Sequence, residues 1–324
     1  MQLSDCWQPS ATLATLQRRA ALLSAVRGFF SQRNVLEVDT PVLSRFGVTD
    51  LHLENLATQL AAFPQQKFYL QTSPEYAMKR LLAAHQVSIY QLGKVFRDDA
   101  VGRYHNPEFT MLEWYRVGFT MNELVDEVVA LIHETLGAGL AVDRLSYQQA
   151  FMQAIQCDPL SASVEQLQHR LAEFAHIADI AQRETDRDTL LQLAMSVIIE
   201  PNFNPQRITI IDNFPASQAA LAQLCPSDSR VAQRFEVYVG GIELANGYQE
   251  LTDAATQQQR FSQDNQLRQQ HGKPHRDADT RLLEALSAGF PQCAGVALGF
   301  DRLLMLQRKK HDIAQVLPFS ISCA

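Results

Sequence analysis

The connections between the predicted strands are the feature of this sequence that most constrains its fold. Strand patterns cover Ile89–Phe96 and residues 110–116, which a polar loop joins, and residues 235–245 contain Gly240-Gly241, a pair typical of a two-residue hairpin turn. Long helical patterns separate the remaining strands, above all between residues 122 and 199. Hairpins join antiparallel strands, so this connectivity predicts an α+β fold on an antiparallel sheet flanked by helices, rather than a doubly wound parallel sheet.

The composition is that of one globular, reduced protein. The 324 residues are 46% hydrophobic and 19% charged, so we predict a single domain over residues 1–324 with a helical insertion at about 122–200. The five cysteines are scattered without a C-x-x-C pair, which argues against a disulfide framework or a zinc site. No signal peptide or apolar run of about 18 residues is present, so we expect a cytoplasmic protein without a membrane segment.

Two arginines and a group of carboxylates indicate where the chemistry lies. Arg97 follows a predicted strand, and Arg302 lies in the first turn of a predicted helix behind Gly299, so each can bind a phosphate. Taken alone, Arg97 can equally pair with a neighbouring acid, and residues 299–302 can be a simple helix cap. Together with the acidic segment 241–250, they indicate a nucleotide polyphosphate with Mg²⁺, which binds carboxylates and phosphate oxygens.

These segments resemble the three signatures of class II aminoacyl-tRNA synthetases, close to the lysyl branch. Thr40-Pro41 resembles the first signature, Phe96-Arg97 with residues 105–113 the second, and residues 295–302 the third. The resemblance runs from about residue 10 to the C-terminus, and the string 106–115 is its most specific part. It is closest to the truncated lysyl-synthetase paralogues that modify elongation factor P.

That resemblance implies a function and a protein partner. It implies ATP-dependent activation of lysine or (R)-β-lysine and its ligation to a lysine side chain of elongation factor P, by a homodimer that makes contact through the first helix, ending at Phe29-Phe30. The first signature begins within 41 residues, so we expect no room for an anticodon-binding barrel. With a net charge of −7, the chain is then a poor candidate for selecting a tRNA.

The resemblance also implies residue roles. Catalysis falls to Arg97, Arg302 and Glu243. ATP binding is carried over to Arg97, Asp98, Asp99, Asn106, Phe109, Glu243, Leu244 and Gly299. Substrate binding is carried over to Ser73, Pro74, Glu75, Tyr115 and Glu250, and magnesium binding to Glu243 and Glu250.

Strand periodicity adds two geometric expectations. Alternation places Phe109, Glu113 and Tyr115 on one face of their strand. Glu243 and Glu250 are seven residues apart, which would put them on opposite faces of an unbroken strand. If both line one site, the strand must break between them, and Asn246-Gly247 is the predicted place.

The sequence departs from the family pattern at two positions. Arg97-Asp98-Asp99 stands where the family has Arg-Asn-Glu, so the acid is one methylene shorter and a bridging water could restore its contact with ATP. Ala297 stands where lysyl-tRNA synthetases have glycine. Its methyl group would favour a differently shaped substrate, an effect worth about 1–3 kcal/mol.

Three alternative functions remain open at this point. The same adenylate chemistry could end on tRNA. A small-molecule amide ligase of the asparagine-synthetase type would need a basic residue where this chain has Glu75 and Glu250. A non-catalytic sensor would have lost a phosphate arginine or the carboxylates, yet Arg97, Arg302 and Glu243 are all present.

Overall fold

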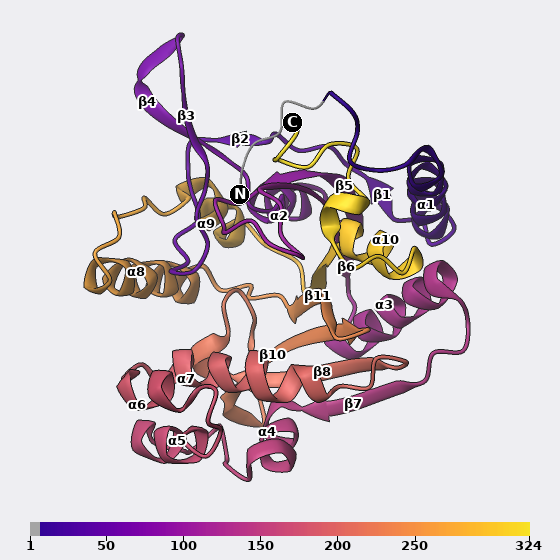
Figure 1. Cartoon of the computed structure of the whole chain (residues 1–324). Helices are drawn as coiled ribbons and strands as arrows, with labels where there is room; N and C mark the ends of the chain where they lie inside the picture. The colour runs from indigo at the N-terminus through magenta and orange to yellow at the C-terminus, as the bar shows by residue number, and fades with distance from the viewer. Residues whose placement is uncertain (1–6) are drawn as a thin grey trace. The chain divides into compact units, whose positions relative to one another are not determined.

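The computed structural model describes residues 7–324, and the chain forms two compact units (Figure 1). Unit 1 consists of Met1–Gly137 and Leu251–Ala324, and unit 2 consists of Ala138–Glu250. The prediction of a single domain stays a prediction. Among residues 7–324, no helix combines the length and the apolar character that crossing a membrane requires.

Unit 1 is built on a sheet whose strands lie in the order β1-β5-β6-β12. β5, β6 and β12 are antiparallel neighbours, whereas the two-residue β1 pairs with β5 in parallel. A second, three-stranded sheet in the order β2-β4-β3 includes a long hairpin, visible at the indigo end of the colour range (Figure 1). The strands are β1 (Leu36–Glu37), β2 (Leu43–Ser44), β3 (Ala57–Leu60), β4 (Phe63–Leu70), β5 (Ile89–Phe96), β6 (Glu108–Val117) and β12 (Cys293–Gly299).

Two helices of unit 1 cover one face of the β5-β6-β12 sheet. Phe30 of α1 stacks on Tyr90 with ring centroids 4.4 Å apart, and Trp114 donates a hydrogen bond to Glu127 of α3 at 3.0 Å. Side chains that alternate with Tyr90 and Trp114 therefore point to the opposite face, where the predicted site residues lie. The helices are α1 (Leu13–Ser31), α2 (Glu75–His85), α3 (Met121–Leu136), α8 (Ala254–Gln270), α9 (Thr280–Ser287) and α10 (Phe300–Gln307).

The last turn of α1 packs inside the chain. Phe29 and Phe30 are fully buried within the chain, because both rings belong to the core between α1 and the sheet. The homodimer and its contact through α1 stay predictions, and any such contact would use the other side chains of this helix.

Unit 2 carries a second run of strands, in the order β11-β10-β8-β7, with β9 paired to β10. β8, β10 and β11 are antiparallel, while β7 is parallel to β8 and was not predicted. The strands are β7 (Val142–Ser146), β8 (Ile208–Pro215), β9 (Leu224–Cys225), β10 (Asp228–Val239) and β11 (Ile242–Gln249).

The helices of unit 2 share a core with β8 and β10. Phe151, Leu167 and Leu190 are fully buried and pack in one cluster with Ile211 and Tyr238 of the strands. The α-helices are α4 (Tyr147–Ile155), α5 (Val164–Leu171), α6 (Ala178–Arg183) and α7 (Arg187–Ala194). A π-helical segment at Met195–Ile199 follows α7, and 3₁₀ turns lie at Glu200–Asn202 and Ala216–Gln218 and, in unit 1, at Ile313–Gln315.

The predicted hairpin turn at Gly240-Gly241 is confirmed. Its φ angles are 62° and 74°, both in the left-handed region that glycine adopts without a steric penalty. The turn joins β10 to β11 and so fixes which residues of the two strands face each other.

Candidate active site

One face of the unit 1 sheet collects most of the predicted substrate-binding and adenine-binding side chains. The expected alternation is confirmed by the β5–β6 register, which pairs Glu113 with Gln91, and by a 2.7 Å hydrogen bond from the Tyr115 hydroxyl to the Glu113 carboxylate. On the same face, the neighbouring strand β12 contributes only small residues. Gly295, Ala297 and Gly299 of β12 pair with Tyr115, Glu113 and Met111 of β6. The Ala297 methyl group therefore lies beside Glu113.

Arg97 links two parts of the predicted site within unit 1. Its backbone N–H donates to the Pro107 carbonyl at 2.9 Å, which fixes the chain where β5 ends. Its guanidinium lies 5.2 Å from the centroid of the Phe109 ring, and its Nε donates to the Thr72 carbonyl at 3.4 Å. Thr72 directly precedes Ser73. Arg97, predicted to bind phosphate, therefore lies next to Phe109, predicted to stack on adenine, and next to the segment predicted to bind the amino acid.

Glu75 is the first residue of α2 and has a cationic partner. Its Oε1 lies 2.7 Å from Nζ of Lys79, one turn later in the helix, and the Lys79 side chain is only 2% exposed. Pro74 occupies the N-cap position without a side-chain hydrogen bond, so Ser73 does not cap this helix. The Glu75 carboxylate is thus held on α2, while its contact with a substrate ammonium stays a prediction.

Asn106 acts as a brace in the loop before β6. Its Nδ2 donates to the Glu108 carbonyl at 2.6 Å, and its Oδ1 accepts the Ile321 N–H at 3.0 Å. The side chain is buried and joins this loop to the C-terminal segment. Contacts of Asn106, Asp98 and Asp99 with ATP stay predictions.

Arg302 is oriented by the residues around it at the start of α10. Its Nη2 lies 3.1 Å from Nε2 of His105, a residue to which the sequence assigned no role. Gly299 occupies the N-cap position, and a Cβ added there would lie 3.3 Å from Cδ of Arg302. The glycine therefore leaves room for the arginine stem to lie against the backbone.

A buried ion pair that sequence reasoning missed anchors the same helix. Asp301 binds Nη1 of Arg19 at 2.5 Å through one oxygen and accepts the Thr110 N–H at 2.7 Å through the other. Arg19 also donates to the Thr110 hydroxyl at 2.6 Å. Because Asp301 precedes Arg302, this pair fixes the start of α10 to β6 and α1. One signal could have revealed this pair: Asp301 is a charged residue that directly follows an apolar segment ending in Gly299-Phe300.

In unit 2, a β-bulge brings the two predicted acids to one face of the β10–β11 hairpin. Glu243 pairs with Tyr238, and Ala245 pairs with Val237, so Leu244 is the extra residue in this register. The predicted break is therefore present, but its predicted place at Asn246-Gly247 is wrong. The extra residue cancels the odd spacing, and Glu243 and Glu250 share a face.

Glu236 and Asn246, which sequence reasoning did not assign, lie on that same face. Asn246 pairs with Glu236 across the hairpin, and its Nδ2 donates to Glu236 Oε1 at 3.2 Å. Arg234 and the Tyr238 hydroxyl also donate to the Glu236 carboxylate. The Asn246 carboxamide oxygen is buried, and among residues 7–324 no group donates a hydrogen bond to it.

The electrostatics of this face favour a cation. Burial raises the pKa of the Glu236 carboxyl, and so does the nearby Glu243, while Arg234 opposes both effects. Glu250 is 1% exposed, and its backbone is fixed by Gln223, which donates to the Glu250 carbonyl at 2.8 Å. A bound ammonium group or metal ion would offset the repulsion between the Glu236 and Glu243 carboxylates.

The comparison with known proteins places the chain in a family. The model of tRNA synthetases class II (D, K and N) matches residues 4–322. A Histophilus somni (strain 2336) protein named elongation factor P–(R)-β-lysine ligase is 50% identical over 327 residues, covering 100% of both chains. Proteins of the same name from Erwinia tasmaniensis and Photorhabdus laumondii are also 50% identical and cover 97% and 98% of both chains.

Proposed function

The chain belongs to the class II tRNA synthetases of the D, K and N type, and from this premise we propose that it is an ATP-dependent ligase that joins lysine or (R)-β-lysine to a lysine side chain of elongation factor P. The name shared by the full-length relatives supports both the substrate and the acceptor. The proposal includes action in the cytoplasm, as the sequence predicts, and a homodimer, as the resemblance to the family implies.

In the first step, the carboxylate of the amino acid attacks the α-phosphorus of ATP in line, which forms an aminoacyl-adenylate and releases pyrophosphate. Phe109 stacks on adenine, with Asn106 beside it. Arg97 stabilises the charge that develops on the α-phosphate oxygens, and Arg302 holds the γ-phosphate. Two contacts support these roles: Arg97 is fixed over Phe109, and Arg302 is oriented by His105.

The acidic residues bind the ammonium groups of the amino acid. On the unit 1 face Glu75 binds an ammonium group, and Tyr115, whose hydroxyl donates to Glu113, contacts the amino acid beside it. On the unit 2 face, Glu250 receives an ammonium group. Asn246 offers a second acceptor, because its Nδ2 is engaged by Glu236 and its carboxamide oxygen is thereby directed away from that carboxylate.

Magnesium fits the carboxylates of the β10–β11 face. Glu243 and Glu250 lie on one face because of the bulge, which suits a divalent cation that takes one or two carboxylates together with phosphate oxygens. We propose that Glu243, with Glu250 as the second carboxylate, would hold Mg²⁺ with ATP, where the ion would neutralise phosphate charge, and that Glu250 also receives an ammonium group of the amino acid.

In the second step, a neutral lysine ε-amine of elongation factor P attacks the adenylate carbonyl carbon. An amide bond forms, the bond between that carbon and the phosphate oxygen breaks, and AMP leaves. The attacking amine must first lose a proton, against a reference pKa near 10.4. The methyl group of Ala297 beside Glu113 narrows the amino-acid side of this face, which favours a substrate with a shifted amino group.

The observation that carries the proposal is the bulge at Leu244, because it places Glu243, Asn246 and Glu250 on one face. The test is to incubate the protein with ATP, each lysine isomer, and either elongation factor P or bulk tRNA, and to weigh the products. An acid-stable mass gain on elongation factor P, with no charging of tRNA, is expected. Alkali-labile lysyl-tRNA, with elongation factor P unchanged, would replace this proposal by tRNA charging.

A further inference from the structure

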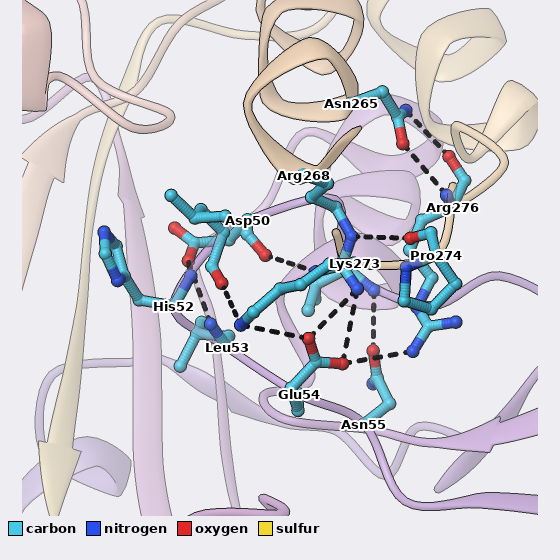
Figure 2. A network of polar contacts seen from close by, with 12 residues as sticks. Asp50, His52, Leu53, Glu54, Asn55, Asn265, Arg268, Lys273, Pro274 and Arg276 are labelled. Atoms are coloured by element: carbon cyan, nitrogen blue, oxygen red, sulfur yellow. Dashed lines mark hydrogen bonds and ion pairs between the residues drawn. The ribbon is translucent and has the colours of Figure 1, made fainter. Parts of the chain in front are cut away.

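Glu54 lies at the centre of a charged cluster in unit 1 that the proposed mechanism does not use (Figure 2). Its Oε1 is 3.0 Å from Nη2 of Arg268 and 3.3 Å from Nζ of Lys273, and its Oε2 is 3.1 Å from Nη2 of Arg276. Arg268 lies near the end of α8, and the other two cations lie in the segment that follows. Three cations from one stretch of chain therefore hold a single carboxylate.

The cations are themselves fixed, so the cluster is rigid. The Arg268 side chain is fully buried and donates to the carbonyl groups of Asp50 and Pro274, both at 2.9 Å. Lys273 donates to the Leu51 carbonyl at 2.6 Å. These bonds tie residues 50–54 to the end of α8.

The Asn265 side chain fixes the third cation, Arg276, by binding the Arg276 backbone. Its Oδ1 accepts the Arg276 N–H at 2.9 Å, and its Nδ2 donates to the Arg276 carbonyl at 2.8 Å (Figure 2). The reciprocal pair holds the segment after α8 in a turn that presents the Arg276 guanidinium to Glu54. Asn265 thus contributes to the cluster without carrying a charge.

The backbone of Glu54 connects this cluster to the loop that carries Arg97. The Asp98 N–H donates to the Glu54 carbonyl oxygen at 2.9 Å, and the preceding Arg97 N–H donates to Pro107. Two successive amides of the loop are therefore anchored, one of them by Glu54. A displacement of Glu54 would shift Asp98 and with it the base of the Arg97 side chain.

We propose that Glu54 is a positioning residue for ATP activation: its carboxylate, held by Arg268, Lys273 and Arg276, sets the place of the Glu54 carbonyl and so of the Arg97–Asp98 backbone. This inference rests on the proposed function, because Arg97 matters to catalysis only if ATP is the substrate. Small misplacements of a catalytic group are costly to rate, since a shift of about 1 Å can reduce it about 100-fold.

The test combines kinetics with hydrogen exchange on the full-length protein. Glu54→Gln removes the charge at the centre of the cluster, and Asn265→Ala loosens the Arg276 turn without changing any charge. Asp143→Asn is the control, because it breaks an ion pair with Arg207 on the surface of unit 2. For each variant, ATP–pyrophosphate exchange gives kcat and the KM for ATP and for lysine, and deuterium uptake is followed in the peptide that contains Asp98.

Glu54→Gln should lower kcat/KM for ATP and accelerate hydrogen exchange at the Asp98 amide, each by about tenfold, the factor expected for loss of about one hydrogen bond. Asn265→Ala should change both in the same direction. The KM for lysine should stay within about twofold, and Asp143→Asn should match the wild type. Unchanged ATP kinetics and Asp98 exchange in both cluster variants would overturn the inference, as would an equal rise of both KM values. A wild-type protein without ATP–pyrophosphate exchange would instead overturn the proposed function, whatever the Asp98 amide does.

Discussion

Replacing Asp301 with asparagine should destabilise the protein and weaken ATP binding together. Asp301 is a buried acid that holds two groups at once: the Arg19 guanidinium at 2.5 Å and the Thr110 N–H at 2.7 Å. Asparagine keeps the size of aspartate but loses its charge. Its NH₂ group would have to face either the Arg19 guanidinium or the Thr110 N–H, and both of these are hydrogen-bond donors. The Arg19 charge would remain buried between Thr110 and the Phe300 ring, 5.0 Å from that ring's centroid.

The size of the effect follows from burial. The Asp301 side chain is 2% exposed and that of Arg19 is 11% exposed, so solvent screens the pair little. Breaking such a pair by removing one partner costs about 3–5 kcal/mol. At about 2.1 cal/mol/K per residue, a chain of this length that unfolds in one transition has an unfolding entropy near 0.7 kcal/mol/K, so Tm should fall by about 4–7 °C.

A double-mutant cycle tests the reasoning. Calorimetry would compare Asp301→Asn, Arg19→Gln and the double variant, and ATP–pyrophosphate exchange would follow Arg302 through the KM for ATP. The double variant should lose less stability than the two single losses added together, because either change alone leaves a buried group without its partner. Glu108→Gln, which breaks the half-exposed pair with Lys94, should cost at most about 1 kcal/mol. Strictly additive losses, or a Tm for Asp301→Asn equal to that of Glu108→Gln, would refute the argument.

Three further predictions concern charge in and around the site. Arg97→Ala should reduce ATP–pyrophosphate exchange by about 100- to 1,000-fold, with an unchanged circular dichroism spectrum, because it removes charge stabilisation of the reacting phosphate; activity within threefold of the wild type would contradict the role. Glu250→Gln should weaken lysine binding much more than ATP binding in calorimetric titration, and equal losses would move Glu250 from the amino-acid pocket to the metal or the scaffold. The pKa of Glu54 is lowered from 4.5, since burial raises it but Arg268 and Lys273 lower it more. Its ionised form therefore stabilises the fold above about pH 4.5, and the stability difference between wild type and Glu54→Gln should shrink as the pH falls below that value.

Much of the fold was predictable because its strands and turns have strong local signals. The strand Ile89–Phe96 has the predicted bounds, and the Gly240-Gly241 turn follows from a residue pair that suits positive φ angles. The parallel pairs β1–β5 and β7–β8 were not predicted. β7 has five residues, and such a short segment carries little periodic signal. The pairing of β1 with β5 joins segments that are distant in sequence, and a local pattern does not reveal such a partner.

The supports of the site were less predictable than its motif residues, because they depend on contacts distant in sequence. Arg19 and Asp301 are 282 residues apart, and Glu54 and Arg268 are 214 apart, so no local pattern relates them. Glu236 did carry a local signal, because it is a charged residue between two apolar residues, Phe235 and Val237, in the same strand. A charge at such a position is costly unless it is paired, which marks it as a candidate for function.

The bulge at Leu244 explains how a motif with the wrong spacing for a strand forms one acidic face. Periodicity correctly required a break between Glu243 and Glu250, but it could not place the break, because Asn246-Gly247 has the residues that usually mark one. In the structure Asn246 stays in register with Glu236, and its amide needs that register to reach the carboxylate. The extra residue therefore precedes Asn246, next to Glu243. Because the bulge interrupts the β10–β11 register at Leu244, it disturbs the regular backbone pairing of a residue to which the family resemblance assigns ATP binding. Deleting Leu244 alone should remove the bulge and keep Glu243 and Glu250 on one face, because the two acids are then an even number of residues apart in an unbroken strand. Deleting Leu244 together with Ala245 makes the spacing odd, so it should turn Glu243 to the opposite face and abolish ATP–pyrophosphate exchange more completely than deleting Leu244 alone. Equal activity of the two deletion variants would contradict this account of the bulge.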